Sequence, residues 1–164
     1  MNRLWIVAVA LAPMIAFAKD NPDENFFENA AQAGIAEVQA GTDAQAKATS
    51  PAVKEFAAMM VKDHSAANAK LKKIAAAKGV KLPDEASLKQ KAMNKKTDMK
   101  SGTSFDADYI AGQVKAHQDT IELLQKEIDS GKDPEAKAFA TEILPKVKMH
   151  LDHANKLATA TATR

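Results

Sequence analysis

The chain has 164 residues, with 23 lysines and arginines against 21 aspartates and glutamates and no cysteine. This nearly even charge balance gives no reason to expect a nucleic-acid or anionic-membrane partner. The lack of cysteine excludes thiol chemistry and disulfides, so stability must come from packing, and an aromatic content of only 5% favours closely packed helices.

The first 18 residues have the pattern of a secretory signal peptide. An apolar run over residues 4–17 follows Arg3 and ends in Ala-Phe-Ala, and these are the basic, apolar and small-residue parts of such a signal. We therefore expect cleavage before Lys19 and export of residues 19–164 as one domain. The run is shorter than the about 20 residues that a membrane span needs, so no transmembrane segment is expected after cleavage.

Apolar residues recur at helical spacing in two segments before residue 80. The first segment, from about Asp23 to Thr49, contains small residues that would let a second helix approach closely. Its stripe is Phe27, Ala31, Gly34, Val38 and Gly41. The second segment begins with Ser50 as N-cap and Pro51 as its first helical residue, and it ends at Gly79. Its stripe is Val53, Phe56, Met60, His64, Ala67, Leu71 and Ile74.

A long lysine-rich crossover, about residues 80–104, separates these segments from two more, and a short helix is expected in it around residues 85–96. The third helix is expected from about Phe105 to Asp129. The fourth begins at Pro134, after Asp133 as N-cap, and Pro145 inside it predicts a kink. The stripes of these two helices are Ile110, Val114, His117, Ile121, Leu124 and Ile128, and Ala136, Ala140, Ile143, Val147, His150, Ala154 and Leu157.

This order of elements predicts an all-α fold. Sustained alternation of apolar and polar residues, the pattern typical of strands, does not occur. Two antiparallel helical hairpins joined by a long crossover are the ferritin-like variety of four-helix bundle, which we expect here.

Three of the four histidines lie on the apolar stripes and should point into the bundle. With a rise of about 1.5 Å per residue, Glu37 lies roughly 18 Å before the first hairpin turn and His64 roughly 20 Å after it. By the same measure, His117 lies roughly 22 Å before the second turn and His150 roughly 27 Å after it. If the hairpins pack with their ends level, the four side chains meet in one layer near the middle of the bundle.

Such a layer is a candidate metal site. One glutamate and three imidazoles can bind a single Zn, Cu, Ni or Fe ion. A ferritin di-iron site is not expected, because it requires Glu-x-x-His on two helices and glutamates on the other two. Here Val61 and Val147 stand three residues before His64 and His150. Asp63 and His153 are expected at the surface; the alternatives are that Asp63 supports an imidazole and that His153 extends the site.

The same residues also suit a purely structural role. Inward histidines often form hydrogen bonds with one another, with a glutamate or with a backbone carbonyl, and Glu37, on the flank of its stripe, is also compatible with exposure to solvent. Nucleophile, phosphate-loop and paired-carboxylate motifs are absent. The sequence therefore favours a non-catalytic binding or stress-protective module over an enzyme, and it leaves the protein partner and the oligomeric state open.

Three fragments of the chain carry a resemblance to a bacterial family. They are FFENAAQAGIAEVQAG, SPAVKEFAAMMVKDHSAANAKLKKIAAAKGV and FDADYIAGQVKAHQDTIELLQKEIDSGKDPEAKAFATEILPKVKMHLDHA. Together they resemble the exported ferritin-like proteins grouped as domain of unknown function 4142, with matching positions for the pair Asp63-His64, for His117 and for His150. The resemblance implies a ferritin-like fold and a location in the cell envelope, in the periplasm or at the outer membrane of a Gram-negative bacterium. It implies no particular activity.

Overall fold

The computed structural model describes residues 23–162, and the predicted signal peptide lies outside them. The described residues form five helices and no strand, which confirms the all-α class. The helices are α1 (Glu24–Lys47), α2 (Pro51–Ala77), α3 (Leu88–Asp98), α4 (Gly102–Ser130) and α5 (Pro134–Ala162). None of the helices within this range combines the length and the apolar character that crossing a bilayer requires.

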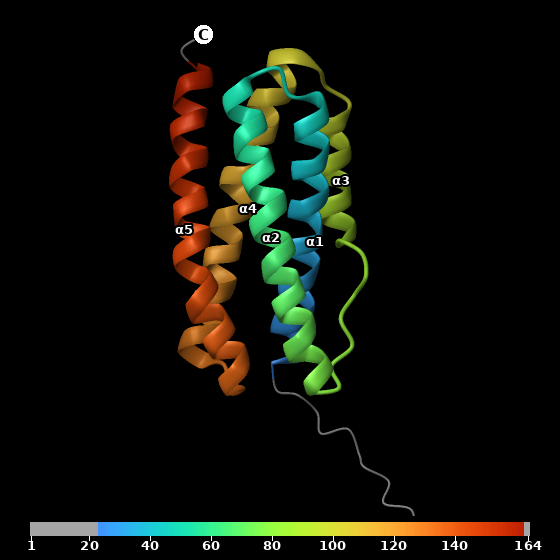
Figure 1. Ribbon diagram of the computed structural model, residues 1–164, viewed down its shortest axis with the longest axis vertical. Helices are drawn as coiled ribbons and strands as arrows, with labels where there is room; N and C mark the ends of the chain where they lie inside the picture. The colour runs from blue at the N-terminus through green and yellow to red at the C-terminus, as the bar shows by residue number, and fades with distance from the viewer. Residues whose placement is uncertain (1–22, 163–164) are drawn as a thin grey trace, which may run out of the picture.

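The four long helices lie side by side, with α3 on the outside (Figure 1). Helices α1 and α2 form one hairpin, and α4 and α5 form the other. The hairpins meet through α1 against α4 and α2 against α5, and α3 contacts α1 and α4. The crossover between α2 and α4 returns along the length of the molecule, so these two helices run in the same direction (Figure 1).

The ends of the helices fall close to the expected positions. The carboxylate of Asp133 accepts hydrogen bonds from the backbone N–H groups of Glu135 and Ala136, at 2.9 and 3.1 Å, as predicted for the N-cap of α5. The side chain of Ser50 makes no capping bond to α2, although the helix begins at Pro51 as predicted. Helix α5 continues through Pro145 as one helix.

Each hairpin turn is held by a carboxylate at the start of the other hairpin. At the α1–α2 turn, Asp106 of α4 accepts hydrogen bonds from the backbone N–H of Thr49 at 3.0 Å, from its hydroxyl at 2.7 Å and from the N–H of Ser50 at 2.8 Å. At the α4–α5 turn, Asp23 accepts from the N–H groups of Lys132 and Asp133. The side chains of the two aspartates therefore connect the hairpins at opposite ends.

The core consists of two apolar clusters with a polar layer between them. One cluster includes Phe27, Leu71, Leu124, Phe139 and Val147. The other includes Val53, Phe56, Met60, Phe105 and Ile110. Between the clusters each long helix has one buried ionisable residue, and along α1, α2, α4 and α5 these are Glu37, His64, His117 and His150. The four side chains thus occupy one level of the core, as the estimate of helix rise predicts.

Helices α1 and α2 approach each other closely at Gly41. A Cβ atom at this position would lie 2.9 Å from Cγ2 of Val61 and 3.1 Å from the carbonyl oxygen of Ala57. Real Cβ atoms essentially never come as close as the first of these distances. The predicted role of the small residues of α1 in close helix packing is therefore confirmed.

Candidate metal centre

Three imidazole rings meet in the polar layer of the core. The ring centroids of His64 and His117 are 5.5 Å apart, those of His64 and His150 are 5.5 Å apart, and those of His117 and His150 are 5.4 Å apart. Each ring offers one nitrogen such that all three nitrogens lie within 4.8 Å of one another. The predicted convergence of these histidines, from α2, α4 and α5, is thus confirmed.

The protonation of two rings follows from their neighbours. Nδ1 of His117 lies 2.8 Å from the carbonyl oxygen of Gln113, which only accepts, so Nδ1 donates to it and Nε2 is the ring nitrogen left for another partner. Nε2 of His150 lies 3.0 Å from Oδ2 of Asp63 and donates to it. This bond leaves the lone pair of His150 on Nδ1. Both free nitrogens are buried and lack a hydrogen-bond partner among the described residues.

The third ring, that of His64, is held neutral by its surroundings. Burial, with smaller contributions from His117 and His150, lowers the pKa of His64 to about 3. Burial also lowers the pKa of His150, although the hydrogen bond to Asp63 opposes this shift. Nε2 of His64 is buried and, within residues 23–162, has no partner. Neutral imidazoles are the form that binds metal ions.

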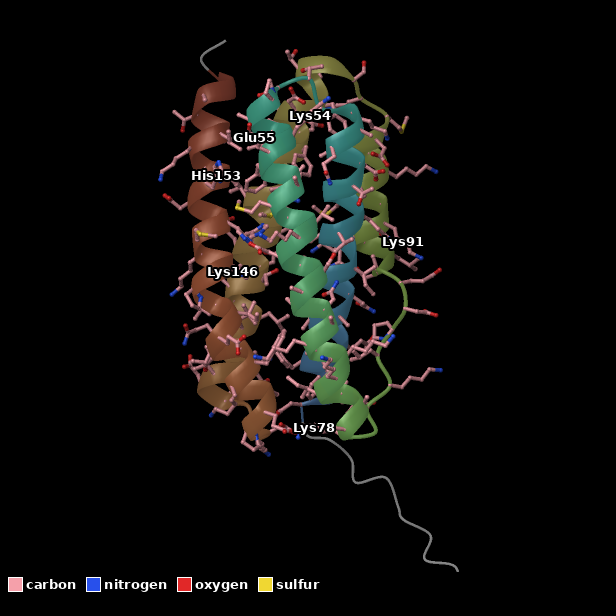
Figure 2. The ribbon with its side chains drawn as sticks, in the orientation of Figure 1. Lys54, Glu55, Lys78, Lys91, Lys146 and His153 are labelled. Carbon is pink, nitrogen blue, oxygen red and sulfur yellow. The ribbon has the colours of Figure 1, made fainter. Side chains whose placement is uncertain are left out.

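Asp63 supports the cluster from the α2–α5 side, which corrects its predicted place at the surface. Its carboxylate contacts both His150 and Nζ of Lys146, the latter at 3.2 Å, and Lys146 lies near mid-height on α5 (Figure 2). Burial alone would raise the pKa of Asp63, but the hydrogen bonds from His150 and Lys146 hold it below its ordinary value. Asp63 is therefore an ionised acceptor that orients the His150 ring.

His153 lies outside the cluster, further along α5 (Figure 2). It is half-buried, where the sequence predicts a surface position, because its ring packs edge-on against Phe56 with 5.2 Å between the ring centroids.

Glu37 is buried at the α1 side of the layer, so the alternative that it faces solvent is wrong. It is not one of the three residues whose ligand atoms lie within 4.8 Å of one another. Burial raises the pKa of its carboxyl, whereas the nearby His117 and a hydrogen bond from the side chain of Gln113 act in the opposite direction. One carboxyl oxygen, Oε2, is buried without a partner in the described part of the chain.

Sequence reasoning missed Gln113 and Tyr109, two polar residues of α4 that accompany Glu37. Both are buried, and the amide oxygen of Gln113 and the hydroxyl of Tyr109 have no hydrogen-bond partner in the described residues. Burial, with a contribution from Glu37, raises the pKa of the Tyr109 hydroxyl. Their spacing is the signal that would have found them, because residues 109, 113 and 117 follow one another at intervals of four on one face of a helix.

The arrangement suits one ion better than two. Its three ligand atoms are neutral nitrogens, and bridged di-iron centres require carboxylates from all four helices. His64, His117 and His150 would hold such an ion through one ring nitrogen each, and these nitrogens lie within 4.8 Å of one another. A fourth ligand position would stay available.

An all-helical protein with a buried cluster of three histidines is thus the class that the fold and the site define. Residues 9–157 match the family model described as Domain of unknown function (DUF4142), so the chain belongs to this family. No curated protein and no solved structure matches the chain.

Proposed function

We propose that the protein binds one transition-metal ion through His64, His117 and His150. The observation that carries the proposal is the convergence of three buried imidazoles whose free nitrogens have no partner in the described residues. Leaving a buried polar atom unpaired costs about 1–3 kcal/mol, so one such atom on each of three adjoining rings favours a ligand shared between the rings.

The supporting contacts of the cluster agree with this proposal. Histidines that bind metals commonly donate their second N–H to a carboxylate or a backbone carbonyl, which fixes the ring. His150 donates to Asp63 and His117 donates to the carbonyl of Gln113 in this manner. Imidazole ligands suit Zn²⁺ and Cu²⁺, and both ions serve as probes.

Metal analysis of His117→Ala tests the proposal. Protein purified without a histidine tag, stripped with a chelator and titrated with Zn²⁺ or Cu²⁺ should bind one ion per chain, and His117→Ala should lose at least about a hundredfold in affinity, since a ligand is removed. His153→Ala is the matched control, because this histidine lies outside the cluster. This variant should bind the metal ion as tightly as the unaltered protein. If the unaltered protein binds neither ion tightly, the histidines serve only the core and the proposal fails.

Glu37 is proposed as the neighbouring negative charge of the bound ion, and the same titration tests it. Glu37→Gln keeps the shape of the side chain and removes the charge. We expect a weaker effect than that of His117→Ala, about tenfold in affinity, because the carboxyl stands outside the group of three ligand atoms. A variant that binds as tightly as the unaltered protein would remove Glu37 from the site.

We further propose that the protein is a ferritin-like four-helix bundle that acts in the cell envelope as a metal-binding or stress-protective module. Two hairpins of long helices joined by a crossover support the first part. The signal-peptide pattern of residues 1–18 supports export to the periplasm. Expression of the full chain in a Gram-negative host, followed by cell fractionation and N-terminal sequencing, should give a periplasmic protein that begins at Lys19. A cytoplasmic protein that keeps residues 1–18 would contradict this.

A further inference from the structure

A cavity lies between α1, α3 and α4, and Glu37 lines it whereas the three histidines do not. Its volume is about 610 Å³, which is within the range of small-molecule sites, about 300–1,000 Å³. Apolar side chains form much of its wall on α1 and α4. They include Ala33, Ala36, Ala40, Phe105, Ala116 and Leu123.

The cavity exists because α3 covers α1 and α4 without filling the space between them. None of the residues of α3 is buried. The helix is held by polar contacts, such as the bond from the amide of Asn94 to the carbonyl of Ala36 at 3.3 Å and the ion pair of Asp98 with Lys47 at 2.8 Å. Lys91 points away from the bundle (Figure 2). Helix α3 therefore acts as a polar cover, and its residues, such as Gln90, Met93 and Asn94, form the outer wall of the cavity.

Three of the residues that line the cavity carry buried polar atoms without a partner in the described chain. They are Oε2 of Glu37, Oε1 of Gln113 and the hydroxyl of Tyr109. The side-chain amide of Gln113 forms a hydrogen bond with Glu37, and the hydroxyl of Tyr109 interacts electrostatically with Glu37. The three residues thus form one group, and each has an oxygen able to accept a hydrogen bond.

We propose that this cavity binds a small primary amine with an apolar stem. An ammonium group has three N–H donors and no acceptor, which matches a carboxylate, an amide oxygen and a hydroxyl oxygen. The carboxylate of Glu37 supplies the opposite charge that a buried cation requires. The stem lies along the alanine-lined wall, where its burial is favourable. None of the three histidines lines the cavity, but Glu37 is shared with the proposed metal site, so the amine is titrated into the metal-free protein.

Gly112 allows the cavity to be filled without disturbing the core. It lines the cavity, and a Cβ atom at this position would meet none of the described atoms within 4 Å. Gly112→Leu therefore places a side chain in the space that the stem would occupy. Gly112→Ala adds a single methyl group and is the matched control.

Calorimetric titration of the metal-free protein with hexylamine tests the proposal. We expect hexylamine to bind. Hexanol has the same stem but cannot form the charge-assisted hydrogen bonds, so it should bind at least about tenfold more weakly. Ammonium chloride has no stem to bury, so it too should bind at least about tenfold more weakly. NMR spectra of the ¹⁵N-labelled protein should place the largest shifts in α1, α3 and α4.

Variants locate the site and separate its two parts. Glu37→Gln should lower the affinity for hexylamine at least about tenfold, because a charged hydrogen bond is lost. Glu122→Gln makes the same change on the exposed side of α4 and should leave this affinity unchanged. Gly112→Leu should abolish binding and Gly112→Ala should keep it. If Glu37→Gln does not fold, Tyr109→Phe takes its place and should weaken binding severalfold. Equal binding of hexanol or of ammonium, no binding of hexylamine, or unchanged binding by Gly112→Leu would each overturn the proposal.

Discussion

The two sides of the polar layer differ in how completely they are packed. On the side of α2 and α5, the three histidines lie against one another and Asp63 holds one of the rings. On the side of α1 and α3, Glu37, Gln113 and Tyr109 line a cavity of about 610 Å³. Both sides contain buried polar atoms without partners in the described residues. This difference in packing distinguishes the two proposed ligands, because a closed cluster suits an ion and a covered space suits a small molecule.

The largest effect that separates the two sides is expected from Asp63→Asn. This variant should weaken metal binding about 10- to 100-fold, because the amide no longer provides the charged acceptor that orients His150. Hexylamine binding should not change, since Asp63 does not line the cavity. Metal titration and calorimetry measure the two effects.

Asp152→Asn is the control for this variant, because Asp152 is exposed and pairs only with Lys156 within α5. It should leave the metal affinity unchanged. Equal losses of metal affinity in Asp152→Asn and Asp63→Asn would show that the metal affinity depends on the net charge of the protein and not on the hydrogen bond between Asp63 and His150.

The difference in packing also predicts opposite effects of one substitution on two helices. Gly41→Ala should lower the free energy of unfolding by about 1–2 kcal/mol, because overpacking against Val61 and the backbone of Ala57 exceeds the gain in helix propensity. Gly112→Ala should raise it by about 0.5–1 kcal/mol, because its methyl group enters open space. Urea denaturation measures both. A stabilising Gly41→Ala would refute the close approach of α1 and α2.

The smallest effect is expected at Glu127, which lies away from both sides of the layer, near the α4–α5 turn. Burial and the nearby Asp23 raise the pKa of Glu127 to about 7. The carboxyl of Glu127 thus keeps its proton to higher pH in the folded protein than in the unfolded chain. The resulting stabilisation of the folded state is fully present below the ordinary glutamate pKa and is lost as the pH rises through about 7.

Glu127→Gln should remove this part of the pH dependence. Between about pH 5 and pH 8, the unaltered protein should lose more stability than the variant, as measured by thermal unfolding at each pH. Glu122→Gln, on the exposed face of α4, should behave like the unaltered protein. Parallel pH profiles for Glu127→Gln and the unaltered protein would contradict the raised pKa.

The layer of histidines could be predicted from the sequence because two local quantities determine it. Helical periodicity indicates which residues face inward, and the distance to the hairpin turn gives their depth. His64, His117 and His150 satisfy both, so their convergence followed from the spacing. The sequence leaves both burial and exposure of Glu37 open, because this residue lies beside the apolar stripe and its direction depends on how far α1 is rotated about its axis.

The contacts of Asp63 and the cavity could not be predicted by the same reasoning. Asp63 and His150 are 87 residues apart, and their bond depends on the rotation of α2 and α5 about their axes, which sequence periodicity gives only approximately. The cavity depends on what α3 leaves unfilled. The sequence predicts a short helix in the crossover, but the position of that helix over α1 and α4 is a tertiary property.

The two aspartates that hold the hairpin turns have a consequence for folding. Thr49 and Ser50 obtain their acceptor from Asp106, 57 and 56 residues further along the chain, and Lys132 obtains its acceptor from Asp23, 109 residues earlier. An isolated hairpin would lack the residue that completes its own turn. The two halves are therefore mutually dependent, and the protein should unfold in a single cooperative transition, without a stage in which one hairpin persists alone.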